Sequence, residues 1–251
     1  MAVNIELMRK KLARLKGEIK DDNKKTSVFF SPEEGETDIR IVPTSDGDPL
    51  KEIHFHYNVP NVSGGVMCPK RNFGEPCAIC EFATSVWKEA VDNDDNEGKG
   101  LAKSLFVRSR YFSPVVVRGK ESDGIKVYGY GKQAYESLLG YLLDPEYGDI
   151  TDIKTGTDIG LVYTKPTKKG AFPTTNLKVR RKTSPLLADK DAIPALLKTM
   201  PNFDELFERK SSADVEDILS KMLDSKDGET TKYSNDDSSD VEDAFKELAG
   251  K

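Results

Sequence analysis

Four side chains of types that commonly bind metal ions lie within one stretch of 25 residues: His56, Cys68, Cys77 and Cys80. The two residues between Cys77 and Cys80 allow one tight turn to direct both thiolates at the same ion, and four such ligands complete the tetrahedral coordination of a structural zinc. Three clustered cysteines suit a metal site in a reducing compartment better than a set of disulfides. The spacing therefore predicts one structural Zn²⁺.

His54 is a second candidate for the histidine ligand. In an alternating strand the imidazoles of His54 and His56 point to the same face, so the pattern alone does not choose between them. His56 is closer in sequence to Cys68 and is the ligand that we expect.

Residues 76–80, PCAIC, also match half of the signature of zinc-dependent nucleobase deaminases. That reaction needs a glutamate two residues after the histidine ligand, and neither His54 nor His56 is followed by one. Cys68 would also fill the position that a catalytic zinc keeps for water. We therefore expect a protein that is not an enzyme; a zinc-ribbon module for protein interaction or transcription is the main alternative.

Basic and aromatic residues alternate in three clusters, over 103–112, 126–135 and 165–184. Aromatic rings stack on unpaired bases and cations bind phosphates, so a protein that binds single strands of any sequence needs both kinds of residue together. The candidate DNA-binding residues are Arg108, Arg110, Tyr111, Phe112, Tyr128, Tyr130, Lys132, Lys168, Lys169, Phe172, Arg180, Arg181 and Lys182.

The formal net charge of −5 hides an uneven distribution of charge. Residues 214–251 hold twelve Asp and Glu against five Lys, a net −7, so the rest of the chain carries +2. Residues 101–184 hold fifteen Lys and Arg against eight Asp and Glu, a net +7, which is a plausible footprint for a polyanion.

Short alternating runs predict a β-rich α+β core with helical insertions. The predicted strands are 38–42, 52–59, 104–117, 125–130, 158–163 and 176–179. The predicted helices are 82–91, 132–143, 193–200 and 213–223, and residues 92–100 read as a surface loop. Beyond residue 225 the polar, acidic composition predicts a disordered tail.

These features together resemble the single-stranded DNA-binding (helix-destabilising) protein of T-even-like bacteriophages. The resemblance rests on the cysteine and histidine spacing, the runs KSLFVRSRYF and VYGYGKQAY, the segment Ile39–Pro43 and the acidic end of the chain. It implies an OB-fold core with a zinc subdomain, and it favours His56 over His54 as the ligand. It also implies cooperative, sequence-independent binding of single-stranded DNA in phage DNA replication, recombination and repair.

The resemblance divides the chain into an arm at 1–21, a DNA-binding core at 22–225 with a zinc subdomain at about 52–100, and a tail at 226–251. It assigns Arg9, Lys10 and Lys11 of the arm to contacts between neighbouring protomers, and the tail to recruitment of replication and recombination proteins. A closer match to the family's basic motif lies at 180–184, so the cluster that mediates those contacts stays open.

No apolar run is long enough to cross a bilayer, and the first residues lack the features of a signal peptide. We therefore expect no membrane partner and a cytoplasmic location, which the resemblance places in an infected bacterial host.

Overall fold

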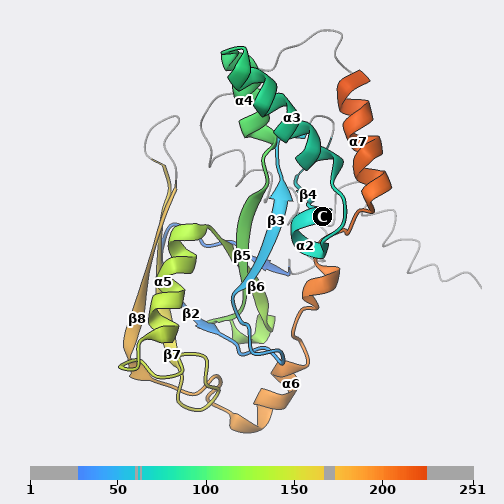
Figure 1. Ribbon diagram of the computed structural model, residues 1–251. Coiled ribbons are helices and arrows are strands. Elements are labelled where there is room, and N and C mark those ends of the chain that lie inside the picture. The colour runs from blue at the N-terminus through green and yellow to red at the C-terminus, as the bar shows by residue number, and fades with distance from the viewer. Residues whose placement is uncertain (1–27, 60–61, 63, 167–172, 225–251) are drawn as a thin grey trace, which may run out of the picture.

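Figure 1 presents the computed structural model, in which residues 28–59, 62, 64–166 and 173–224 are described. The predicted arm at 1–21 and tail at 226–251 lie outside these residues, as do Arg9, Lys10, Lys11, Lys168, Lys169 and Phe172.

The described part of the chain is a mixed α+β fold with one large sheet. The strands are β1 (Phe29–Phe30), β2 (Gly35–Ile41), β3 (Lys51–His56), β4 (Val66–Met67), β5 (Arg108–Val117), β6 (Lys126–Tyr130), β7 (Thr157–Thr164) and β8 (Thr174–Thr183). The α-helices are α2 (Pro69–Phe73), α3 (Ala78–Asp92), α4 (Asn96–Leu105), α5 (Lys132–Leu143), α6 (Ile193–Leu197) and α7 (Ser212–Asp224). Single 3₁₀ turns form at Glu121–Asp123, Lys190–Ala192 and Phe203–Glu205.

The long strand β5 organises the sheet. Its first half pairs antiparallel with β3, its second half pairs with β2 along the same edge, and β6 pairs with its other edge. The sheet continues from β2 to β7 and β8, and from β6 to a parallel β1. Because β5 meets three neighbours, it connects the two ends of the molecule.

Other elements cover both faces of the sheet, because alternate side chains of β5 pack in cores on opposite sides. Tyr111, Val115 and Val117 pack in a core beneath α5, whereas Phe112 and Val116 pack in cores on the opposite face, which the segment 186–207 covers. Successive residues of a strand point to opposite faces, and two covered faces give β5 an unbroken buried run from residue 111 to 117.

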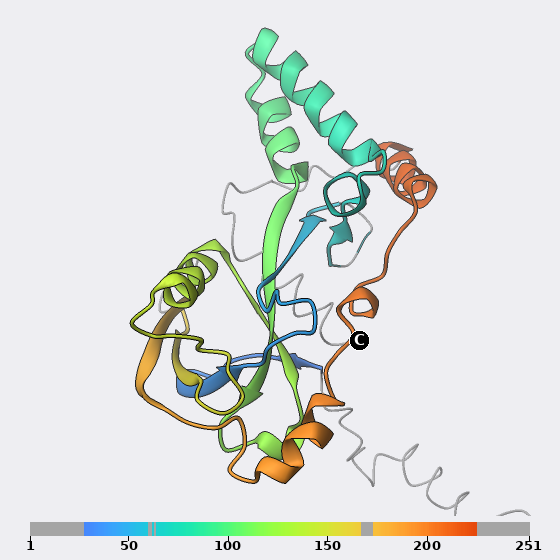
Figure 2. The same cartoon turned by 60° about the horizontal axis from the view of Figure 1, so that its bottom comes forward.

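A helical lobe stands at one end of the sheet (Figures 1 and 2). It consists of α2, α3, α4 and the short strand β4, with α7 packed against α3. Its core includes Ile79, Leu105 and Val215, all fully buried. The segment from α6 to α7 runs from the opposite end of the sheet back to this lobe. Helix α7, the last described helix, therefore completes a lobe whose other elements come from the first half of the chain.

A buried arginine holds β2 to β7 and to the residue that follows β8. Arg40 is fully buried and pairs with Asp158 at 2.8 Å, and it donates hydrogen bonds to the carbonyl and hydroxyl oxygens of Ser184. Arg118 binds the same carboxylate at 2.7 Å. Burial lowers the pKa of Arg40, but the Asp158 carboxylate opposes that shift. Arg40, which the sequence resemblance singled out, is therefore a structural residue.

Several predicted bounds differ from the structure: the helix at 193–200 ends at 197, and the strand at 176–179 spans 174–183. Residues 92–107 differ in the type of element. Residues 92–100, predicted as a loop, contain the end of α3 and the start of α4, and the Asp95 side chain caps α4 by accepting a hydrogen bond from the Glu97 amide. Residues 104–107, predicted as strand, end α4 and lead into β5. Helix α5, in contrast, has the predicted bounds.

Candidate metal centre and nucleic-acid interface

The four predicted metal ligands come together where the sheet meets the lobe. His56 ends β3, and Cys68 directly follows β4, which pairs with β3 through His56 and Val66. Cys77 occupies the N-cap position of α3 without a capping hydrogen bond from its side chain, and Cys80 lies in the first turn of that helix. The β3–β4 hairpin therefore supplies two ligands and the start of α3 supplies the other two.

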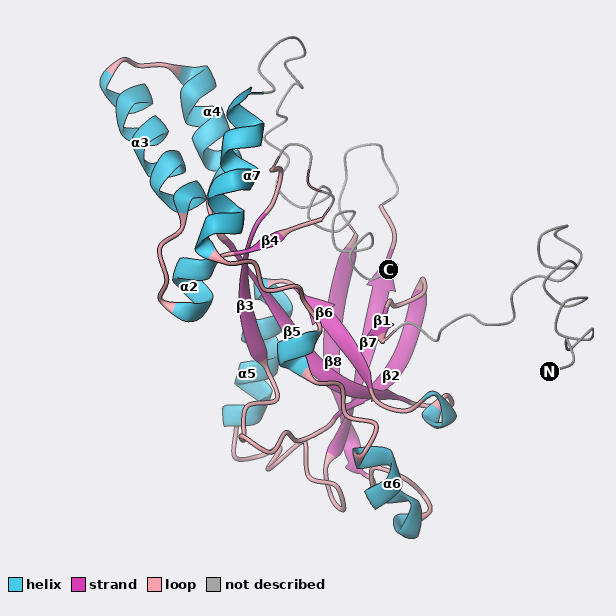
Figure 3. Ribbon diagram, turned by 90° about the vertical axis from the view of Figure 1, so that its right-hand side faces the viewer, coloured by secondary structure: helices cyan, strands magenta, loops and turns pink. Residues whose placement is uncertain are grey.

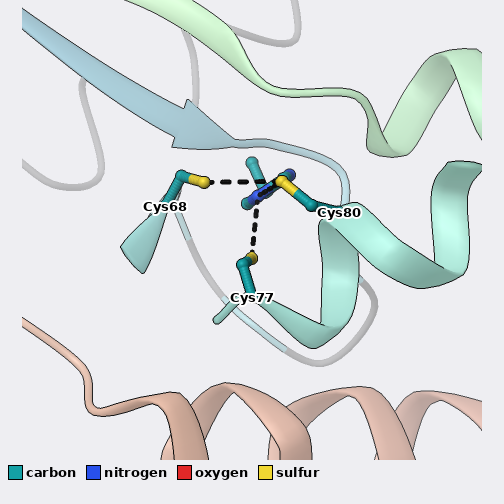
Figure 4. A group of neighbouring side chains, drawn as sticks. Cys68, Cys77 and Cys80 are labelled. Atoms are coloured by element: carbon teal, nitrogen blue, oxygen red, sulfur yellow. Dashed lines mark hydrogen bonds between the residues drawn. The ribbon is translucent and has the colours of Figure 1, made fainter. Parts of the chain in front are cut away.

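The ligand atoms of His56, Cys68, Cys77 and Cys80 all lie within 4.8 Å of one another. The Cys68 and Cys80 sulfurs are 3.5 Å apart, and the His56 Nε2 lies 3.4 Å from the Cys77 sulfur and 3.5 Å from that of Cys80. Figure 4 shows Cys68 facing Cys77 and Cys80, which both come from the start of α3. Tetrahedral zinc with bonds of about 2.3 Å to sulfur holds its sulfurs about 3.8 Å apart, so the cluster has the size that one metal ion requires.

The hydrogen bonds around His56 fix which nitrogen faces the cysteines. Its Nδ1 lies 2.8 Å from the Leu105 carbonyl oxygen at the end of α4, and a proton on Nδ1 donates to that oxygen. The Nε2 then faces the sulfurs and is the nitrogen that would bind a metal, in the orientation that backbone carbonyls commonly impose on ligand histidines.

The chemistry of the group also suits a cation. Hydrogen bonds with Cys77 and Cys80 lower the pKa of Cys68, and hydrogen bonds with Cys68 and Cys77 raise that of Cys80. One thiolate is therefore favoured without a metal, and a bound metal would displace the remaining thiol protons. Burial alone would lower the pKa of His56, but hydrogen bonds with Cys68 and Cys77 and with the Leu105 carbonyl raise it to about 9. These residues, three of them buried, would hold one metal ion, which would cross-link the β3–β4 hairpin to α3.

The structure separates the two histidines. His54 lies half-exposed, with its Nε2 3.5 Å from the Glu52 carboxylate, and is not part of the cluster. The expectation of His56 as the ligand agrees with this geometry.

The predicted basic and aromatic residues of β5 point in different directions. Arg108, Arg110 and Phe112 share one face of the strand, and Tyr111 points to the other. Their adjacency in the sequence therefore does not make one continuous surface.

Phe112 is a correction to the sequence analysis, because its side chain is fully buried. Its ring packs against Phe207 with centroids 4.9 Å apart and against Phe55 at 6.4 Å. The pleat sends Phe112 into the core between the sheet and the segment 203–207, so its ring is not open to a nucleobase.

Tyr111, Tyr128 and Tyr130 are also buried, on the α5 face of the sheet. The Tyr111 ring stacks on that of Tyr135 at 3.8 Å, and the Tyr130 hydroxyl lies 2.7 Å from the Ser113 hydroxyl oxygen. The expectation that these rings line an open groove is not met in this conformation, because α5 covers the face to which they point.

The predicted cations fall into two groups. Arg180 lies across the sheet in ion pairs with Glu36 and Asp38, both at 2.6 Å, and Lys132 pairs with Glu136 on α5 at 3.6 Å. The others lie at the ends of β5 and β8: Arg108 and Arg110 are half-exposed, and Arg181 and Lys182 are exposed.

Lys103 adds a cation that the candidate residues omitted. It is exposed on the last turn of α4, its Nζ lies 5.6 Å from the centre of the Trp87 ring, and its carbonyl oxygen accepts a long contact of 3.5 Å from Arg108. The junction between α4 and β5 therefore presents a run of positive charge next to the metal-binding cluster.

The fold and the site define an α+β protein in which a buried centre of three cysteines and one histidine adjoins a basic strand end. The chain belongs to the family described as gp32 DNA binding protein like, whose model matches residues 33–225. No curated protein matches the chain. The family is one of DNA-binding proteins rather than of enzymes, and membership supports single-stranded DNA binding in general.

In the described ranges, no helix is both long enough and apolar enough to cross a membrane.

Proposed function

We propose that this protein coats single-stranded DNA cooperatively and without regard to sequence, in the replication, recombination and repair of bacteriophage DNA. The observation that carries the proposal is the family match, because residues 33–225 include both the sheet and the metal-binding lobe. In the same proposal the sheet is an OB-fold of the kind found in T-even-like phages, and the protein works in the cytoplasm of an infected bacterium.

The DNA-binding surface in this proposal is the end of the sheet nearest the lobe. Lys103, Arg108 and Arg110 lie where α4 joins β5, and the hairpin of β7 and β8 points toward the same end of the molecule (Figures 1 and 3). Arg181 and Lys182 lie at the other end of β8, where Thr183 pairs with Thr157, and would contact DNA as a separate basic group. Lys168, Lys169 and Phe172, outside the described residues, stay candidates from the sequence. Stacking by Tyr111, Tyr128 or Tyr130 would require that α5 move away from the sheet.

The metal in this proposal is one structural Zn²⁺, held by His56, Cys68, Cys77 and Cys80. With all four positions taken by protein ligands, no position is left for a reacting water, which favours a structural role over a deaminase site. The ion would hold the junction of lobe and sheet, and with it the basic end of β5, in a fixed shape.

The remaining segments keep the roles that the family resemblance implies. The arm at 1–21, with Arg9, Lys10 and Lys11, would contact neighbouring protomers on the strand. The tail at 226–251 would recruit replication and recombination proteins. The core in this division spans 22–225.

A length titration tests the proposal. Homopolymeric single strands of increasing length are added at fixed salt, and binding is followed by quenching of the Trp87 and tyrosine emission. If the protein coats single strands cooperatively, the affinity of each protomer rises with the number of protomers that the strand can hold. It differs little between strands of different base composition. Binding confined to one sequence, or absent for all strands, would contradict it and would favour a zinc-ribbon interaction module.

A further inference from the structure

The Tyr57 hydroxyl is a polar group that the interior of the protein leaves unused. The side chain is fully buried, and its oxygen has no hydrogen-bond partner among the residues that the structure describes. A buried polar group without a partner costs free energy, so natural proteins rarely keep one without a reason.

The β3–β5 register explains where this hydroxyl lies. Phe55 pairs with Arg108 and Ile53 pairs with Arg110, so both arginines share the face of the sheet to which Phe55 points. Tyr57 follows Phe55 on that face, with the two rings 5.7 Å apart. One neutral donor and two cations therefore share this face of the sheet, at the end of β3.

Gly65 fixes the Tyr57 ring in this place. A Cβ atom at position 65 would lie 2.8 Å from the Cε1 of Tyr57, so only glycine lets the β3–β4 hairpin pack this closely over the ring. The hydroxyl is thus held by packing on the ring rather than by a hydrogen bond of its own.

The hydroxyl keeps its proton at neutral pH. The ordinary pKa of a tyrosine is about 10, so the phenol carries its proton at neutral pH. A protonated phenol can donate a hydrogen bond, and a hydrogen bond to an ionised oxygen is stronger than one to a neutral oxygen.

We propose that Tyr57, Arg108 and Arg110 form a binding site for one phosphodiester group of single-stranded DNA, in which the Tyr57 hydroxyl donates to a non-bridging phosphate oxygen. The inference rests on the proposed function, since it names a contact within that DNA-binding surface. Arg108 and Arg110 are half-exposed, so DNA can reach them. The buried Tyr57 hydroxyl would be uncovered only when the two guanidinium groups turn outward to the phosphate.

The variant Tyr57→Phe tests the site because it removes one oxygen and keeps the ring. Its affinity for single-stranded DNA falls about 10-fold, as expected for the loss of one hydrogen bond to a charged group. The melting temperature of the free protein stays the same or rises, because the deleted hydroxyl has no partner to lose. A residue with a merely structural role would not give this combination.

The matched control is Tyr141→Phe. The Tyr141 hydroxyl donates to the Leu177 carbonyl oxygen at 3.0 Å, away from the arginines. This variant is expected to lower the melting temperature and leave the DNA affinity of the folded protein unchanged.

A second strand chemistry identifies the ligand atom. Against a strand with alternating neutral methylphosphonate linkages, the difference in affinity between the natural protein and Tyr57→Phe shrinks if the hydroxyl binds a phosphate. A difference of the same size on both strands would overturn the phosphate assignment.

Two further results would overturn the inference: equal affinity of both proteins for the unmodified strand, or a lower melting temperature of Tyr57→Phe without DNA. Failure of the natural protein to bind any single strand would instead contradict the proposed function itself.

Discussion

At the scale of single residues, the metal-binding cluster separates two histidines that the sequence alone left equivalent. His56 turns toward the three sulfurs at the end of β3, whereas His54 lies beside Glu52 at the surface. Alternation along the strand predicted that both side chains point to one face. In the structure β3 ends at His56, and the hydrogen bond from His56 Nδ1 to the Leu105 carbonyl oxygen turns its Nε2 toward the cysteines.

Replacing each histidine in turn tests that distinction. His56→Ala is expected to bind less than one metal ion per chain and to lose the stabilisation that the metal supplies, about 4 kcal/mol when free metal exceeds its Kd 1,000-fold. His54→Ala should match the natural protein in metal content and in thermal unfolding. Metal analysis and melting curves measure both; equal metal content in the two variants would contradict the assignment.

Phe112 illustrates where residue patterns mislead. Its position beside Arg110 and Tyr111 suggested a DNA-stacking role. On β5, however, its side chain points to the face that Phe207 covers, and it packs in that core. Sequence adjacency cannot reveal which face of a strand is covered when both faces are.

Phe112→Ala is expected to lower the free energy of unfolding by about 3–5 kcal/mol, because the substitution leaves a cavity in the core. Its folded fraction should bind single-stranded DNA as the natural protein does. Denaturant unfolding and DNA titration are the measurements. The control is Arg181→Gln at the exposed end of β8, which should weaken DNA binding and leave the free energy of unfolding unchanged. Normal stability and weakened binding in Phe112→Ala would restore the stacking role.

At the scale of elements, the sequence predicted strongly periodic segments well. It predicted poorly the segments whose residues are chosen for packing against another element. Lys132–Leu143 forms a helix with the predicted bounds because its apolar residues recur at helical spacing. Helix α4 was missed because Gly98 and Gly100 are poor helix formers. The reason for Gly98 is tertiary: a Cβ there would lie 2.9 Å from the Cβ of Ala90 on α3, so glycine permits the two helices to pack closely.

Helix α7 is the element that closes the metal-binding lobe. Val215 is fully buried against the same core that contains Cys68 and Cys77. Val215→Asp is expected to lower the free energy of unfolding by about 2–4 kcal/mol, because it buries a charge without a partner. It should also speed the release of metal to a chelator.

The control on the same helix is Glu216→Gln, whose side chain is exposed. It should unfold and release metal like the natural protein. Natural rates of metal release in Val215→Asp would mean that α7 does not support the cluster.

At the scale of the whole molecule, opposite charges are attached to the same chain. Residues 101–184 carry a net +7 and residues 214–251 a net −7. A tethered acidic segment competes with DNA for cations, and salt screens both interactions.

Deleting residues 226–251 is therefore expected to raise the affinity for single-stranded DNA at low salt and to change it less at high salt. Titrations of both proteins at several salt concentrations measure the effect. Parallel salt dependences with equal affinities would contradict competition by the tail. A full-length variant in which the aspartates at 236, 237, 240 and 243 are replaced by Asn tests whether the effect comes from the charge of the tail rather than from its length.

The central claim is that a metal-stabilised core binds single-stranded DNA chiefly through its cations. The most direct measurement is the affinity for one mixed-sequence single strand and for its duplex, at two salt concentrations, with the metal content of the same sample determined. We predict one zinc per chain and strong preference for the single strand, with an affinity that falls as salt rises. Equal affinity for the duplex, or single-strand affinity that does not change with salt, would contradict the account.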